Sequence, residues 1–232
     1  RDYLPNRYAD YRPVGVADDD SQLSFWTLEQ LLADGVLTPD RLAARFCREP
    51  IFGIGINVSQ FVRNYTERGL PWHRCGPESA GNGALMRIAP VLIPYLRKPS
   101  VDLWVDVVLA AMLTNNDSAS IAACVAFVNI LWQLLRRNSP PEPGWWVDTY
   151  VQTAKELEIK EDYRPRGGQY LSYAGPLWRF VDTHVREAYR ANWSVRQASD
   201  AWHSGAYLLE TVPSVLYILM RHGGDAEEAI VR

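Results

Sequence analysis

Residues 119–135 read ASIAACVAFVNILWQLL and form the most apolar stretch of the chain. The stretch contains Asn129 and Gln133, and it is shorter than the about 20 apolar residues that a bilayer-spanning helix needs. A helix buried in the core of a globular protein explains it better than a membrane span. Asn116 and Asp117 come directly before it and are typical of the start of such a helix.

Start and stop signals for helices recur on both sides of this stretch. Asp20 or Ser21 is expected to begin a helix that Gly35 ends, and Thr38 followed by Pro39 begins the next. Further helices are expected over residues 58–68, 83–97, 102–113, 117–137, 146–157, 177–191, 194–202 and 207–222, with Pro90 and Pro94 kinking or shortening the second of these.

No stretch alternates apolar and polar residues as a half-buried strand does, so the sequence predicts an all-α fold. Residues 139–144 (SPPEPG) and the polar residues 155–169 mark two possible boundaries. We interpret both as surface loops, because neither side carries a separate chemistry. The prediction is therefore a single domain over residues 1–232.

Composition and charge exclude several classes of function. Of the 232 residues, 47% are hydrophobic, which allows a sizeable core, and the net charge of -3 argues against non-specific binding of nucleic acid. Cys47, Cys75 and Cys124 form no CxxC pair, which favours a reduced, cytoplasmic interior over a disulfide framework or a zinc site. We expect a monomer. No targeting segment is visible, but the chain starts at Arg1 without Met, so this absence proves little.

The first candidate constellation is the acidic run Asp18-Asp19-Asp20, followed by Ser21. Adjacent carboxylates repel one another unless water or a cation screens them. One interpretation is a solvated N-terminal cap, because a helix dipole stabilises negative charge there. The other is a site for Mg²⁺ or Mn²⁺, which prefer oxygen ligands.

The second constellation is ESAGNGALMR, residues 78–87. Gly81 and Gly83 allow the backbone to approach a ligand, while Ser79 and Asn82 supply hydrogen-bonding side chains. The run is expected to lead directly into the helix over residues 83–97, whose free N–H groups would suit a phosphate or a diphosphate. It lacks the Lys of a P-loop and the preceding strand of a Rossmann motif. A tight turn between helices remains the alternative interpretation.

Together the two motifs resemble those of the ADP-ribosylglycohydrolase family, which includes the enzyme that reactivates dinitrogenase reductase and the protein ADP-ribosyl hydrolases. Residues 18–23 correspond to the family's Thr-Asp-Asp-Thr-Gln-Met motif, and residues 79–87 match its S-x-G-N-G-x-x-M-R motif. A looser match places residues 206–216 (AYLLETVPSVL) on the family's G-Y-x-V-D-T-L-x-A-A-L helix, with Tyr207 and Glu210 aligned to its Tyr and Asp. The resemblance spans nearly the whole chain.

The resemblance implies an all-α orthogonal multi-helix bundle that binds ADP-ribose in a cleft above two divalent metal ions, Mg²⁺ or Mn²⁺. By this correspondence Asp18, Asp19 and Asp20 are metal ligands, and Asp19 and Asp20 are also the catalytic residues. The implied substrate-binding residues are Ser79, Ala80, Gly81, Asn82, Gly83, Asn115 and Tyr207.

The sequence departs from the family pattern at several places. Asp18 replaces the family's Thr, Ser79 stands where some members carry an acidic residue, and Asn115 replaces a His whose ring would stack on adenine. The N-terminal G-D-x-x-G segment and the C-terminal Asp-x-Asp-Thr motif are not found in the chain. We therefore expect the single domain to lack these two segments, and its metal site to be incomplete without them.

The function that the resemblance implies is metal-dependent hydrolysis that removes ADP-ribose from Arg or Ser side chains, or from a related acceptor. An alternative is a catalytically inactive relative that binds ADP-ribose or blocks an ADP-ribosylating toxin as an immunity protein. An all-α phosphohydrolase is a distant third option, because no His-Asp metal pair is present.

The remaining candidates are interpreted as structural. The four histidines show no metal-binding spacing, and Trp145-Trp146 is expected to be core or a loop anchor. Two basic pairs are interpreted as solvated faces: Arg136-Arg137 and Arg164 with Arg166.

Overall fold

A computed structural model describes residues 17–231. The α-helices are α1 (Asp19–Asp34), α2 (Pro39–Phe46), α3 (Ile56–Thr66), α4 (Asp102–Met112), α5 (Ser118–Leu134), α6 (Pro143–Ala154), α7 (Leu177–Phe180), α8 (Arg186–Arg190), α9 (Val195–Trp202), α10 (Leu208–His222) and α11 (Ala226–Val231). The described residues also form three 3₁₀ segments and one π-helical turn. The 3₁₀ segments are η1 (Trp72–Arg74), η2 (Leu85–Arg87) and η3 (Ala89–Tyr95), and the π-helical turn is η4 (Val181–Val185). Within residues 17–231 there is no β-strand, only isolated bridges, so the prediction of an all-α fold is confirmed.

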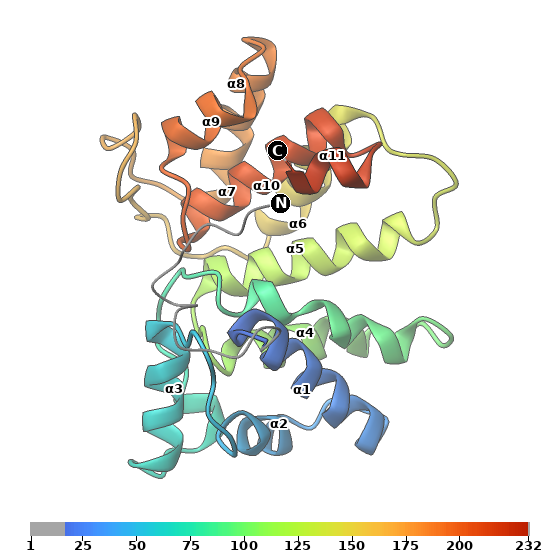
Figure 1. The fold of residues 1–232 in the computed structure, drawn as a ribbon, viewed down its shortest axis with the longest axis vertical. Coiled ribbons are helices and arrows are strands. Elements are labelled where there is room, and N and C mark those ends of the chain that lie inside the picture. Colours follow the sequence, from blue (N-terminus) through green and yellow to red (C-terminus); the bar gives the residue numbers. More distant parts are fainter. Residues whose placement is uncertain (1–16, 232) are drawn as a thin grey trace.

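Helix α5 lies in the middle of the molecule, with α1 to α4 on one side and α6 to α10 on the other (Figure 1). Its Ala122 and Ala126 belong to one hydrophobic core, whereas Val125 and Val128 belong to the other. Small side chains on one face let neighbouring helices pack closely. The prediction of a buried core helix over residues 119–135 is thus confirmed, and no helix in the described part of the chain is long and apolar enough to cross a membrane.

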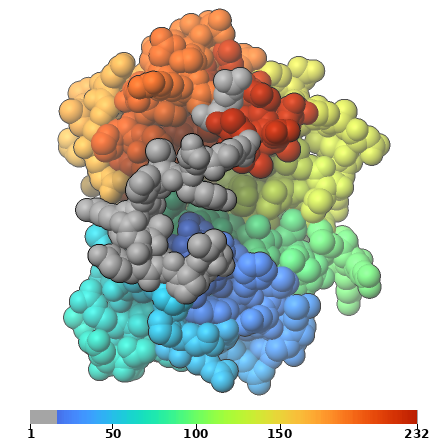
Figure 2. Space-filling view, in the orientation of Figure 1, coloured from blue at the N-terminus to red at the C-terminus, as the bar shows by residue number. Residues whose placement is uncertain are grey.

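The two cores divide the chain by sequence. Trp26, Phe46 and Phe61 belong to the N-terminal core, and Phe180 and Trp202 belong to the C-terminal core. In the space-filling view of Figure 2 the N-terminal elements, blue to green, occupy the lower half and the C-terminal ones, orange to red, the upper half. The orientation of α5 between them fixes how the two halves meet.

The predicted caps hold in part. Asp18, not Asp20 or Ser21, is the N-cap of α1, and its side chain accepts from the backbone N–H of Ser21. The chain turns into the helix two residues earlier than expected because the Asp18 carboxylate already satisfies an N–H of the first turn. Gly35 ends α1 in the left-handed conformation, and Pro39 begins α2 after Thr38, as predicted.

The predicted helix over residues 83–97 is wrong. The segment forms two short 3₁₀ pieces, η2 and η3, instead of one α-helix. Pro90 and Pro94 explain the difference, because each lacks an N–H donor and its ring clashes with the preceding turn of an α-helix. The chain after Gly83 therefore stays tightly wound and irregular.

Other boundaries shift by a few residues. Helix α6 begins at Pro143 and ends at Ala154, so it includes the end of the predicted loop 139–144 and stops short of the predicted residue 157. The predicted helix over residues 177–191 contains the π-helical turn η4 between α7 and α8. Helix α9 ends at Trp202 as predicted, and Ser194 caps its start with a capping box.

Candidate functional site

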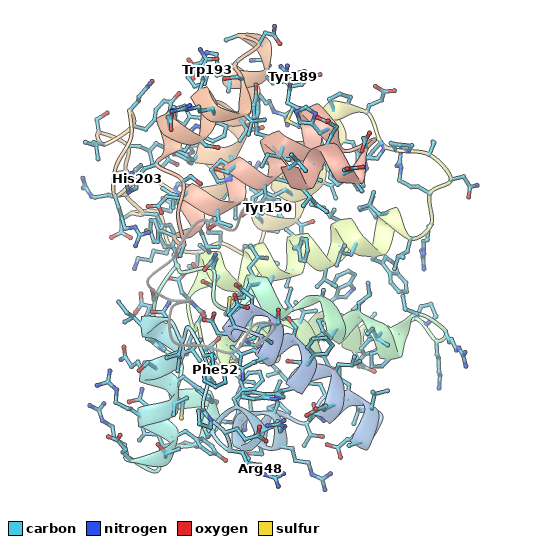
Figure 3. The ribbon with its side chains drawn as sticks, viewed as in Figure 1. Arg48, Phe52, Tyr150, Tyr189, Trp193 and His203 are labelled. Atoms are coloured by element: carbon cyan, nitrogen blue, oxygen red, sulfur yellow. The ribbon has the colours of Figure 1, made fainter. Side chains whose placement is uncertain are left out.

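A cavity of about 550 Å³ lies between the start of α1, the start of α3 and the segments around residues 80 and 206. Its lining residues come from both halves of the molecule: Asp19, Asp20, Gly53, Gly55, Ile56, Asn57, Val58, Ser79, Gly81, Asn82, Gly83, Met86, Arg166, Ala206 and Tyr207. The loop before α3 is tied to α1, because the backbone N–H of Phe52, labelled in Figure 3, donates to Oε1 of Gln22 (2.8 Å). The volume of the cavity suits a small-molecule ligand.

Three adjacent carboxylates form the acidic end of the cavity. One oxygen from each of Asp18, Asp19 and Asp20 lies within 4.8 Å of the others. Partial burial raises the pKa of Asp19 above its ordinary value, and the neighbouring Asp20 raises it further. The pKa of Asp20 is raised by burial and then by Asp18. The cluster therefore carries unfavourable negative charge, which a hard cation would relieve.

The loop of residues 79–83 is held from below by two buried side chains. Nδ2 of Asn115 lies 3.1 Å from the carbonyl oxygens of both Ser79 and Gly81. The Ser120 hydroxyl donates to the same two oxygens at 3.1 and 3.2 Å. These carbonyls point into the protein, so the other face of the loop is turned to the cavity.

A second support comes from the start of α3. Nδ2 of Asn57 donates to Oγ of Ser79 at 3.0 Å. A Cβ atom at Gly81 would lie 2.6 Å from this Nδ2, and one at Gly83 would lie 3.2 Å from Oδ1 of Asn115. The two glycines are therefore needed for close packing against these amides.

The loop is also paired with the segment before α10. The N–H of Asn82 donates to the carbonyl of Ala206, and that of Leu208 donates to Ala80, both at 2.9 Å. Only the short 3₁₀ turn η2 follows the loop. The regular helix that the prediction placed after the loop is thus absent, and one of the loop N–H groups is already used, whereas binding of an anion by the loop stays a prediction.

One arginine, Arg166, also lines the cavity. Nε and Nη2 of Arg166 donate to the two carboxylate oxygens of Glu210, at 2.8 and 2.7 Å. The guanidinium carbon lies 4.9 Å from the centre of the Tyr207 ring. Arg166 is exposed, as expected for a solvated face, but it is also paired with the buried Glu210 and lines the cavity, which the sequence did not predict.

Comparison with known proteins agrees with this geometry. The family model described as ADP-ribosylglycohydrolase matches residues 1–232. The chain belongs to the ADP-ribosylglycohydrolase family.

Two relatives of this ADP-ribosylglycohydrolase family member extend the comparison. A solved structure described as an ADP-ribosylglycohydrolase-related protein complex matches with a TM-score of 0.60 and 21% identity, over 94% of this chain and 64% of that one. An uncharacterized protein of Archaeoglobus fulgidus is 29% identical over 131 residues, which are 54% of this chain and 42% of the relative. The chain thus spans less than two thirds of either relative. The solved structure shows that the fold is of the ADP-ribosylglycohydrolase type.

Most residues that the family resemblance selected do line one cavity. The acidic motif contributes Asp19 and Asp20, the loop contributes Ser79, Gly81, Asn82 and Gly83, and the segment before α10 contributes Tyr207. Asp18 is exposed beside the cavity, where it caps α1. Residues far apart in the sequence are thus brought together as the ADP-ribosylglycohydrolase motifs indicated.

Two more of the selected residues do not line the cavity. Asn115 is 0% exposed and Ala80 is 4% exposed. In this structure neither residue is therefore placed to contact a ligand in the cavity. Asn115 instead supports the loop from behind, and the Ala80 side chain packs into the C-terminal core.

Sequence reasoning missed Asn57 and Arg166. The glycines at 53 and 55 and Asn57 were recognisable as a loop, but nothing in the spacing indicated that Asn57 contacts Ser79, 22 residues later. Arg166 lies 44 residues before its partner Glu210. The alignment of Glu210 with an acidic family position was the available signal.

Proposed function

We propose that the protein hydrolyses the glycosidic bond that joins ADP-ribose to a protein side chain, an arginine or a serine, or to a related acceptor. The observation that carries the proposal is the single cavity that brings the acidic motif and the Gly-Asn-Gly loop together. A cavity of about 550 Å³ is of the size that holds one nucleotide-sized ligand.

Two divalent ions, Mg²⁺ or Mn²⁺, are part of this proposal. The chemistry of the donor set fits part of such a site, because three carboxylates within 4.8 Å of one another supply hard oxygen ligands, and the remaining coordination positions would need water or further ligands. Asp18, Asp19 and Asp20 would hold the metal, which when bound lowers the pKa of a water molecule and orients the sugar.

The carboxylates of Asp19 and Asp20 have a further role in the proposed reaction. Cleavage of a glycosidic bond develops positive charge on the sugar ring in an oxocarbenium-like transition state. Negative charge held next to the anomeric carbon stabilises that state more than the neutral ground state. Asp19 is partly buried, which strengthens the interaction of its carboxylate with the developing charge, and Asp20 lies next to it.

The rest of the cavity positions the substrate. The side chains of Ser79 and Asn82 offer hydrogen bonds to ribose hydroxyls or phosphate oxygens, and the glycines let these groups approach the backbone. The ring of Tyr207 provides an apolar wall against which a sugar face can pack.

The test is hydrolysis by the purified protein of peptides carrying ADP-ribose on arginine or on serine, in Mg²⁺ and in EDTA. Release of free ADP-ribose is expected in Mg²⁺ alone. Asp19→Asn should abolish it, whereas Asp40→Asn, at an exposed position in the first turn of α2, should not. Binding of ADP-ribose without any release would favour the alternative, a relative that binds ADP-ribose or occludes an ADP-ribosylating toxin. Failure to bind ADP-ribose would reject both hydrolysis and binding of ADP-ribose, and would leave occlusion of a toxin as the alternative.

The proposed setting is the cytoplasm. The three cysteines form no disulfide, and burial raises the pKa of the Cys47 and Cys124 thiols to about 12, which keeps them protonated and unreactive.

A further inference from the structure

Charged residues of both signs line the main cavity. Asp19 and Asp20 line it from the start of α1, and Arg166 lines it beside the ring of Tyr207. Arg166 is the only cationic residue among the described residues that line the cavity. An anionic group of a ligand would be repelled by the two carboxylates and attracted by the guanidinium.

The side chain of Arg166 is held in place by a buried partner. The Glu210 side chain is 1% exposed, whereas that of Arg166 is 56% exposed, so the carboxylate lies inside the protein and the guanidinium faces outward. The paired bonds use the edge formed by Nε and Nη2 and leave Nη1 turned away from Glu210. Arginine has five N–H donors, so several remain for a ligand.

Glu210 is itself fixed. It lies in the first turn of α10, where a helix dipole stabilises negative charge, and its Oε2 accepts from the backbone N–H of Tyr207 at 3.4 Å. A Cβ atom at Gly205 would come within 2.4 Å of the same oxygen, so this position needs glycine for the carboxylate to fit. The guanidinium is thus oriented before any ligand arrives, which reduces the entropy lost on binding.

From this geometry we infer that Arg166, positioned by Glu210 and stacked on Tyr207, binds the phosphate oxygens of the ligand and so sets which end of it faces the acidic cluster. The inference rests on the proposed function for the identity of the ligand, a nucleoside diphosphate sugar. A guanidinium donates two parallel hydrogen bonds to one phosphate, which a lysine ammonium cannot do.

The chain offers a matched pair of variants to test this role. Arg166→Gln removes the cation in the cavity, and Arg164→Gln removes an exposed arginine two residues away that does not line it. Arg166→Lys keeps the charge and loses the paired geometry. Calorimetry with three probes, ADP-ribose, inorganic pyrophosphate and adenosine, separates recognition of phosphate from recognition of the nucleoside.

For Arg166→Gln we expect the Kd of ADP-ribose and of pyrophosphate to rise about tenfold, the scale of one charge-assisted hydrogen bond, with adenosine binding unchanged. Arg166→Lys should lie between this variant and the wild type, and Arg164→Gln should match the wild type. In the hydrolysis assay Arg166→Gln should raise KM more than it lowers kcat. An Arg166 that only stabilised the fold would lower Tm without this selectivity.

The other outcomes of these experiments distinguish failure of the inference from failure of the proposed function. Equal phosphate affinity of Arg166→Gln and the wild type would overturn the inference, and hydrolysis by the wild type would still support the proposed function. Pyrophosphate binding that depends on Arg166, in a protein that releases no ADP-ribose, would reject the proposed activity and support the inference. A wild type that binds neither phosphate probe would overturn it.

Discussion

Nδ2 of Asn115 lies 3.1 Å from the carbonyl oxygen of Gly81, so a fully buried amide supports the loop on the cavity floor. The orientation of this amide is set from the core. Arg87 donates to Oγ1 of Thr114 at 2.7 Å, and that hydroxyl donates to Oδ1 of Asn115 at 3.1 Å. The NH₂ group must then face the loop.

Asn115→Asp should therefore disturb the loop more than a change of one atom suggests. The carboxylate would place an acceptor against two carbonyl oxygens and leave a buried charge unpaired, so we expect a loss of about 2–4 kcal/mol in unfolding free energy. Chemical denaturation measures this loss. Asn129→Asp, at a partly buried amide that bonds to Thr153 on α6, is the control and should cost less. Equal losses in the two variants would contradict the supporting role of Asn115.

Asn82→Ala should weaken ADP-ribose binding by about 1–2 kcal/mol, the scale of one good hydrogen bond to a ligand. The N–H and carbonyl of residue 82 bond to Ala206 and Met86, and these bonds survive the substitution. The loop should therefore keep its shape, and Tm should change little. Unchanged affinity in calorimetry would show that Asn82 has only a structural role in the turn.

Asp19→Asn and Asp20→Asn should each abolish metal-dependent release of ADP-ribose while the fold survives. In the absence of metal both variants should be at least as stable as the wild type, because the raised pKa of each carboxyl shows that its charge is unfavourable in the folded state. Activity close to that of the wild type in both variants would reject the assignment. Thermal melts in EDTA check the stability.

Much of this site was within reach of sequence reasoning. The acidic run and the Gly-Asn-Gly loop could be found because the residues of each are adjacent in the sequence. A sequence motif detects such neighbours. The start of α1 was placed two residues too late, because Asp18, Asp20 and Ser21 are all good caps and only the three-dimensional structure selects one.

The missed residues act across long sequence separations. Arg166 reaches Glu210 through the packing of the long loop 155–176 against α10, and no local pattern encodes that contact. Asn115 was predicted to contact the substrate because the ADP-ribosylglycohydrolase motif has a His at that position. Its burial follows from the turn between α4 and α5, which places it under the loop.

A buried carboxyl outside the cavity provides a test of pH dependence. Glu158 is 7% exposed, and its two oxygens accept from the backbone N–H groups of Leu177 and Trp178 at the start of α7. Burial raises its pKa from 4.5 to about 7. A carboxyl whose pKa is higher in the folded state than in the unfolded state favours folding when it is protonated.

The contribution of Glu158 to the unfolding free energy should therefore fall as pH rises from about 4.5 to about 7 and level off above that, a decrease of about 2 kcal/mol between pH 5 and pH 8. Burial lowers the pKa of His184, which acts in the opposite direction, so the comparison must be between variants. Glu158→Gln should flatten the profile, because its side chain does not titrate. Glu156→Gln, at an exposed neighbouring position, should leave it unchanged. Urea denaturation at several pH values measures all three proteins, and parallel profiles for Glu158→Gln and the wild type would show that the pKa of Glu158 is the same in the folded and unfolded states.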